Sequence, residues 1–231
     1  MPIKIKFLKK TSGKQAANQV IFAGENFKAN NLRKYVSASE HSYISDLLKS
    51  SDLKKNVIVF EVNSKKKIIL IAVKNNLKSF EIENLGAELY GRINYGKNNE
   101  YYVNSDSLSI NHENFISHFL HGLKLKSYEF SKYKSKKQIR IILLNILGNK
   151  KIPSPKVQLK FEALEKGAFY ARDLVSEPGN VLHPDEYAKR LNSLRKDGLK
   201  VNIYDKKKLK KLGMHALLGV GQGSIRGSYL V

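Results

Sequence analysis

Residues 57–73 read VIVFEVNSKKKIILIAV and carry the clearest structural signal in the chain. They hold two short apolar runs, Val57–Val62 and Ile68–Val73, separated by a polar, lysine-rich turn. Continuous apolar runs of this length are typical of strands buried on both faces of a parallel or mixed sheet. We therefore expect a sheet that is covered by helices on both sides.

Similar signals lie on either side of this stretch and define an α/β pattern over residues 1–147. Further strands are expected at Ile3–Leu8, Gln19–Ala23 and Ile139–Leu144. Apolar residues at helical spacing predict three helices between the strands. Their apolar positions are Tyr43, Leu47 and Leu48; Phe80, Ile82, Leu85, Leu89 and Tyr90; and Phe115, Phe119, Leu123 and Leu125. Strands that alternate with helices favour layered α/β architecture.

Residues 148–156 interrupt the pattern with glycine, two prolines and three lysines. This composition predicts a domain boundary, with one domain over residues 1–150 and a second over residues 151–231. The second domain should begin with a helix whose apolar stripe must pack on something and which stops at Glu177–Asn180. The stripe consists of Val157, Phe161, Leu164, Ala168, Ala171 and Val175.

A second helix should start at Pro184 and end near Gly198, with Tyr187, Leu191 and Leu194 on its apolar face. We expect a short strand at Val201–Tyr204 and then a brief helix, capped by Asp205 and closed by Gly213. The chain ends on the apolar residues 229–231. Residues 151–231 supply too little surface to bury the first helix, so we expect the second domain to be truncated.

Composition excludes several classes of protein. The 231 residues are 42% hydrophobic, which excludes a disordered or fibrous chain, and contain no cysteine, which excludes disulfides, a thiol nucleophile and cysteine-ligated metals. The longest aliphatic run, Ile68–Val73, is too short to span a bilayer, and the N-terminus alternates like a strand and does not resemble a signal peptide. We expect a cytoplasmic protein that does not insert into membranes.

The chain has 42 basic and 20 acidic residues and a formal charge of +22. Such a surplus permits nucleic-acid binding through counterion release. However, 35 of the basic residues are Lys, only 7 are Arg, and the charge is spread over both domains. Because recognition of bases and phosphates favours arginine, a solvated lysine-rich surface is the preferred interpretation, and a nucleic-acid-binding accessory domain is the alternative.

Two patterns are candidate chemical sites. His118 and His121 share a helical face close to His112, which permits a metal site, but a surface histidine cluster is favoured because no carboxylate completes the set. The glycine-rich residues 219–224 read GVGQGS and could cradle an anion. A structural turn is favoured, because Ser224 stands where the dinucleotide pattern requires glycine.

Two segments resemble the leucyl (cytosol) aminopeptidase family. Residues 169–184, FYARDLVSEPGNVLHP, are similar to the segment that opens its catalytic domain, and residues 211–224, KLGMHALLGVGQGS, are similar to a later segment in the same order and at the same separation. Weaker similarity covers residues 43–48 and 125–130. Ser176 replaces the usual Asn, and His183 replaces a helix-capping Thr or Ser, at a cost of about 1 kcal/mol.

The resemblance implies an N-terminal macro-domain-like mixed sheet with flanking helices, followed by the start of an α/β metallopeptidase domain. The family is a hydrolase and protease that removes N-terminal amino acids from peptides with two divalent ions, manganese or zinc, and forms homo-hexamers. A nucleotide pocket in residues 1–147 ranks last, because no phosphate loop is evident there.

The family's metal-binding segment K-G-x-T-F-D-S-G-G does not occur in residues 1–231. We therefore assign no catalytic, cofactor-binding or metal residue. These residues by themselves are expected to bind no metal and to be inactive as a metalloprotease.

Overall fold

The computed structural model describes residues 2–8, 18–28, 32–135 and 140–231. They form two compact units, Met1–Phe169 and Tyr170–Val231. The division falls inside helix α4 (Pro155–Ser176). Each unit is described by itself.

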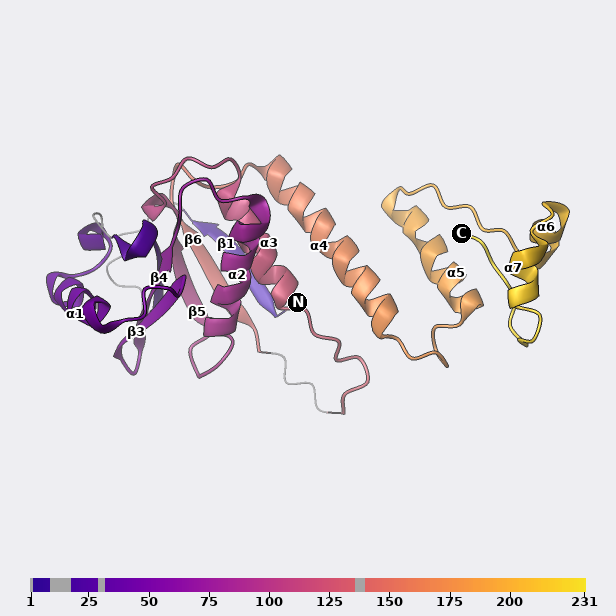
Figure 1. Cartoon of the computed structure of the whole chain (residues 1–231), viewed down its shortest axis with the longest axis horizontal. Coiled ribbons are helices and arrows are strands. Elements are labelled where there is room, and N and C mark those ends of the chain that lie inside the picture. Colours follow the sequence, from indigo (N-terminus) through magenta and orange to yellow (C-terminus); the bar gives the residue numbers. More distant parts are fainter. Residues whose placement is uncertain (1, 9–17, 29–31, 136–139) are drawn as a thin grey trace. The chain divides into compact units, whose positions relative to one another are not determined.

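The first unit is built on a six-stranded mixed sheet in the order β1-β6-β5-β2-β4-β3 (Figure 1). All neighbouring strands are parallel except β3 and β4, which form an antiparallel pair. The mixed α/β sheet expected from the sequence is therefore confirmed. The strands are β1 (Ile3–Leu8), β2 (Asn18–Ala23), β3 (Val57–Asn63), β4 (Lys66–Ala72), β5 (Glu100–Asn104) and β6 (Ile142–Leu147).

Two strands differ from the expectation. The strand predicted at Ile139–Leu144 is β6 at Ile142–Leu147, and Ile139 lies outside the described residues. Asn145 interrupts the apolar run but is buried, and its side-chain Nδ2 donates to Glu100 Oε1 at 2.8 Å. The buried amide of Asn145 is acceptable because its partner Glu100 lies on the adjacent strand β5. Strand β5 itself was not predicted, because it has too few aliphatic residues to be recognised from its sequence.

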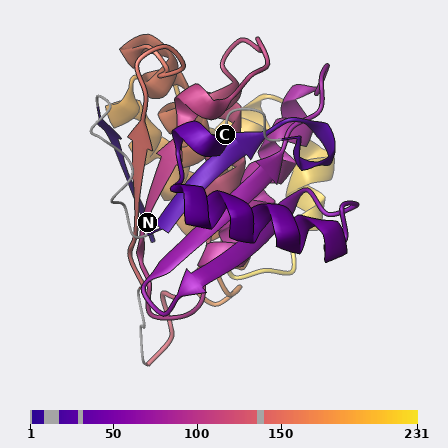
Figure 2. The same ribbon diagram turned by 90° about the vertical axis from the view of Figure 1, so that its left-hand side faces the viewer.

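Helices cover both faces of the sheet. Residues of β4 alternate between two apolar cores, with Ile69 and Ile71 in one and Ile68 and Leu70 in the other. Helices α2 (Ser79–Ile93) and α3 (Phe115–Lys126) supply the first core. Helix α1 (Ala38–Ser50) supplies Ile44 to the second and lies in front of the strands in Figure 2. The three predicted helices and the two-sided burial are confirmed.

Helices α2 and α3 approach each other so closely that their backbones meet at two glycines. A Cβ atom built on Gly86 would lie 1.8 Å from the carbonyl oxygen of Phe119, and one on Gly122 would lie 1.9 Å from that of Glu83. No side chain fits at either position without moving a helix. By contrast, Gly91 on α2 faces open space.

We predict that Gly122→Ala lowers the free energy of unfolding by about 3 kcal/mol, because the methyl group must push the two helices apart. Gly91→Ala is the matched control and should raise it by up to about 1 kcal/mol through helix propensity. Urea denaturation followed by circular dichroism measures both. Equal effects of the two substitutions would contradict the close approach.

The segment between β6 and α4 contains the predicted boundary at residues 150/151. It is attached to the first unit, because the Asp106 carboxylate accepts backbone N–H groups of Asn149 and Lys150 at 3.1–3.2 Å. The predicted helix is α4, but of the six members of its apolar stripe only Phe161 is buried, whereas Leu164 is 50% and Val175 87% exposed, in keeping with the expectation that residues 151–231 supply too little surface to bury the stripe. The buried residue one turn after Phe161 is Glu165, which apolar spacing could not reveal.

The second unit consists of short helices joined by turns. Helix α5 (Pro184–Ser193) starts at the predicted proline, and Asp205 caps α6 (Lys206–Lys211) by accepting the Lys208 N–H at 2.9 Å. Gly198 and Gly213 have the positive φ angles, 87° and 72°, expected of helix ends. The remaining helix is α7 (His215–Val220).

The strand expected at Val201–Tyr204 is a wrong prediction. Of these residues only Tyr204 pairs, in an isolated antiparallel bridge with Leu230. A β-branched run forms a strand only when a neighbour satisfies its backbone groups along its length. Among the described residues, no helix is long and apolar enough to cross a membrane.

Candidate functional site

The predicted histidine cluster lies between α2, α3 and α4. His118 Nδ1 lies 2.8 Å from a Glu83 carboxylate oxygen, and His121 Nδ1 lies 3.4 Å from one of Glu165. Glu83 and Glu165 were not recognised from the sequence, because they are 35 and 44 residues away from their histidine partners. His112 Nδ1 contacts the backbone carbonyl of Glu113 instead.

Glu165 makes this cluster part of the helix packing and not a surface feature. Its side chain is 1% exposed and also accepts from Lys124 Nζ at 2.6 Å. His121 is 9% exposed, so the prediction that these histidines lie on the helix surface is wrong for His121. A carboxylate this deeply buried needs a cation beside it, and Lys124 supplies the cation.

We predict that Lys124→Met lowers the free energy of unfolding by about 3 kcal/mol, because it leaves a buried carboxylate without its lysine. The double variant Lys124→Met/Glu165→Met should recover most of that loss, since no buried charge remains. Lys126→Met, at an exposed position two residues along α3, is the control and should change stability by less than about 0.5 kcal/mol. Chemical denaturation of these four proteins measures the recovery, and a double variant no more stable than Lys124→Met would contradict it.

A second place in the first unit resembles a ligand crevice. A cavity of about 370 Å³ lies at the carboxyl ends of β2 and β4, where open α/β sheets commonly bind ligands. Glu25, Lys28 and Tyr35 are among its lining residues. Burial raises the pKa of the Tyr35 phenol, and the charge of Asp106 raises it further. These three side chains are an acid, a base and a neutral phenol, so together they favour neither a positively nor a negatively charged ligand.

In the second unit, Arg190 on α5 joins two carboxylates. Its guanidinium lies 2.9 Å from Glu177 and 3.0 Å from Glu186. The Glu177 side chain is 2% exposed, so this charge is sequestered in the turn that follows α4. The hydrogen bond from Arg190 lowers the pKa of Glu186, and the bonds to Glu177 and Glu186 raise the pKa of Arg190.

Asp185, in the first turn of α5, connects the two segments singled out in the sequence. It interacts with His183 Nδ1 and lies 3.4 Å from the guanidinium of Arg226, which follows the glycine-rich segment. Desolvation by itself would raise the pKa of the Asp185 carboxyl. Hydrogen bonds from its own backbone and from His183, together with the charges of His183 and Arg226, outweigh desolvation, so the pKa is lowered. Residues 41 positions apart in the chain thus meet at one carboxylate.

His183 also stands at the helix-cap position. Its Nδ1 lies 3.4 Å from the Glu186 backbone nitrogen, where a Thr or Ser hydroxyl would act, and can accept that N–H only in the tautomer that does not donate to Asp185. The glycine-rich residues 219–224 lie in the end of α7 and the turns after it, as the structural interpretation predicted. Both segments therefore have a structural role that is visible in the second unit.

The carboxylates described in residues 151–231 do not form a metal centre. Among the residues that the structure describes, no group of three or more His, Cys, Asp or Glu side chains is placed to hold a metal ion. Glu165, Glu177, Glu186 and Asp185 face lysine, arginine or histidine, and Asp205 caps a helix. These residues do not fit a pair of divalent cations, so no metal-dependent step is derived from them.

Comparison with known proteins identifies what these segments are. The model of the cytosol aminopeptidase family, catalytic domain, matches residues 169–231, the range that contains the Glu177–Arg190 and Asp185–Arg226 pairs. A probable cytosol aminopeptidase of Nitrobacter winogradskyi is 36% identical over 166 residues, which is 67% of this chain and 32% of that protein. This chain belongs to the cytosol aminopeptidase family.

Other relatives extend the comparison. The probable cytosol aminopeptidase of a Bradyrhizobium species is 44% identical over 119 residues, 48% of this chain and 23% of that protein. A mutant of tomato leucine aminopeptidase has the same fold over 98% of this chain and 49% of its own, with a TM-score of 0.77 and 21% identity. The chain thus spans between 23% and 32% of the length of these curated cytosol aminopeptidases.

In this member of the cytosol aminopeptidase family, we predict that Arg190→Met increases amide hydrogen exchange in residues 177–193 about a hundredfold, because the buried Glu177 carboxylate loses its ion pair with Arg190. Lys189→Met is the control, since Lys189 is 81% exposed and lies 3.8 Å from Glu186. Exposed pairs of that kind contribute less than about 1 kcal/mol, so its exchange should barely change. Similar exchange in the two variants would show that Arg190 does not hold the turn.

Proposed function

We propose that this chain supplies the N-terminal portion of a metallo-aminopeptidase that removes N-terminal amino acids from peptides. The observation that carries the proposal is the match of residues 169–231 to the cytosol aminopeptidase catalytic domain, combined with the meeting of its two segments at Asp185. In the whole protein, two divalent ions, manganese or zinc, would activate the attacking water.

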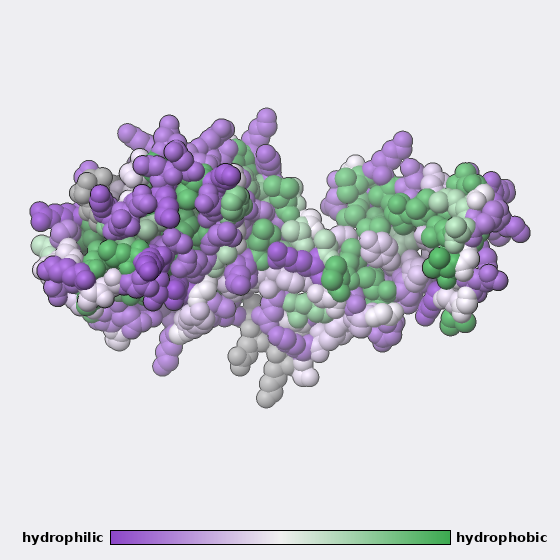
Figure 3. All heavy atoms as spheres, in the orientation of Figure 1, coloured by the Kyte–Doolittle hydropathy of each residue, from purple (hydrophilic) through white to green (hydrophobic). Residues whose placement is uncertain are grey.

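In this proposal residues 170–231 provide a framework and not the reacting groups. Three of their acids, Glu177, Asp185 and Glu186, are engaged by His183, Arg190 and Arg226. Their surface is also unusually apolar, with Val220 88% and Ile225 99% exposed, and green apolar residues spread over the α5 and α7 region in Figure 3. Large exposed apolar side chains favour a surface that further polypeptide covers. Catalysis would therefore require residues that the chain 1–231 does not contain.

Two further features belong to the same proposal. A macro-like role for the first domain is supported by the mixed sheet with helices on both faces. A cytoplasmic location is supported by the printed names of the relatives and by the absence of cysteine from the sequence.

The test is a chimera with the Nitrobacter winogradskyi relative. Residues 1–231 of this chain replace the matched part of that protein, and hydrolysis of leucine amide is measured with manganese or zinc added. We expect turnover by the chimera and none by the chain 1–231 alone, because two-metal hydrolysis needs converging carboxylates. The unaltered relative is the positive control.

Each outcome of this test is informative. Turnover by residues 1–231 alone would contradict the claim that the catalytic groups lie elsewhere. A chimera that folds and binds metal but leaves leucine amide intact would contradict the aminopeptidase assignment.

A further inference from the structure

Strand β3 is an edge strand whose outer side has no partner strand among the described residues. The Asn56 carbonyl accepts the Ala72 N–H at 2.8 Å, and the antiparallel register then pairs Ile58 with Leu70 and Phe60 with Ile68. In an antiparallel ladder, alternate residues direct their backbone groups to opposite sides. The N–H and C=O groups of Val57 and Val59 therefore point away from β4, as do those of Glu61, whose carbonyl already accepts the Tyr43 hydroxyl at 3.2 Å.

The outer edge of β3 is apolar at its centre and charged at its two ends. Val57 belongs to the core that α2 and α3 cover, and Val59 is partly buried against the same core. Ile58 is partly buried against the other core, which α1 covers. Lys55 precedes the strand, and Glu61 lies near its other end. An edge of this kind is a template for another strand unless it is covered.

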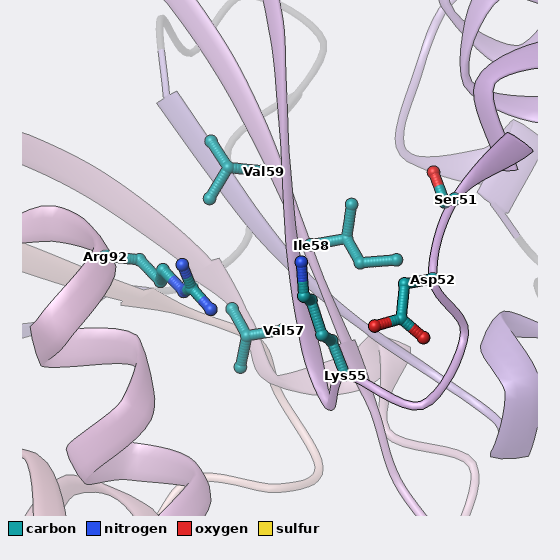
Figure 4. Close-up of a pocket in the computed structure, with 7 residues that line it drawn as sticks. All are labelled: Ser51, Asp52, Lys55, Val57, Ile58, Val59 and Arg92. Atoms are coloured by element: carbon teal, nitrogen blue, oxygen red, sulfur yellow. The ribbon is translucent and has the colours of Figure 1, made fainter.

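A pocket lies beside this edge at its basic end. It has a volume of about 330 Å³ and is lined by Val57, Ile58, Val59, Lys55 and Arg92, with Ser51 and Asp52 on its far side (Figure 4). The Lys55 ammonium forms no ion pair with any residue in the described part of the chain. Arg92 is held only loosely, 3.8 Å from Glu88. Although Asp52 lowers the local charge, the two cations dominate, and the pocket can accept a carboxylate.

We propose that a second copy of this chain pairs with β3 in antiparallel fashion, so that two sheets join across a two-fold axis at Ile58. This register places Val57 opposite Val59 of the second copy, and both direct free backbone groups at each other. It also places Lys55 beside Glu61 of the second copy, twice, once on each side of the axis. The edge is thus complementary to itself in hydrogen bonds, apolar side chains and charge, as a two-fold interface requires.

The side-chain faces agree with this register. Residues that lie directly opposite in a sheet project from the same face, and Val57, Val59 and Glu61 occupy odd positions of β3, whereas Lys55 lies in the turn before the strand and lines the pocket beside it. If the register slipped by one residue, backbone groups that point away from β4 would face backbone groups that already bond to β4. The hydrogen bonds between β3 and β4 therefore exclude that register. Glu61 already lies 2.6 Å from Lys67, but its side chain is 68% exposed and has room for a second cation.

The dimer should be weak and should depend on salt. The paired segment is short, because the register of β3 shifts between Glu61 and Asn63. Each copy carries a formal charge of +22, so two copies repel at low ionic strength. At about 0.15 M salt the screening length is about 8 Å, which suppresses the long-range repulsion more than the adjacent ion pairs.

Sedimentation analysis of the full chain over a range of concentrations in 0.15 M salt tests the proposal. Lys55→Glu and Glu61→Lys should each weaken dimerisation about tenfold or more, because two attractive pairs become repulsive. Combining them restores the pairing, since each copy then presents both reversed charges. Lys126→Glu on α3 is the control for net charge and should leave the dimer unchanged.

Val59→Pro is a second variant that acts through the backbone. It removes an N–H that does not bond to β4, so the sheet should survive and the dimer should be lost. Circular dichroism verifies the fold of every variant. A chain that stays monomeric at all concentrations overturns the proposal and leaves the edge to another strand or to solvent. A dimer that persists in Val59→Pro, or a charge exchange that fails to restore it, overturns it as well.

Discussion

Two-sided burial of the central strands is the constraint on which the first unit depends. Ile68, Ile69, Leu70 and Ile71 are each at most 1% exposed, although successive side chains point to opposite faces of the sheet. Such a strand is stable only when both faces are covered, so helices must lie on each side. On one side, Gly86 and Gly122 let the backbones of α2 and α3 come into contact. The sheet in turn leaves β3 as an edge.

The second unit is held together by different forces. Its buried apolar side chains are few among the described residues, with Leu174, Ala188 and Leu209 as the main examples. Charged pairs and helix caps supply most of its specific contacts, and Arg190 and Asp185 each join separate parts of the chain. Ion pairs of this kind define geometry better than they add stability. This balance suits a part of a larger domain, in agreement with the proposed function.

Sequence reasoning located the functional segments but not their contacts. Residues 169–184 and 211–224 were recognised from their motifs, and the family comparison confirmed them. Neither the Asp185–Arg226 pair nor the Glu165–Lys124 pair could be predicted, because each joins residues 41 apart. The contact of the His183 ring nitrogen with the Glu186 N–H was not predicted, because capping preferences describe hydroxyl and carboxylate side chains.

Local sequence patterns are enough to predict the α/β class, the central strands and the ends of most helices, because apolar runs, proline and glycine act locally. They place β6 too early, since Asn145 breaks the apolar run, and they miss β5 altogether. That Glu165 is buried on α4 together with the apolar Phe161 and Leu174 could be seen only in the folded chain. Burial of a charge depends on a partner elsewhere in the chain, and only folding brings that partner near.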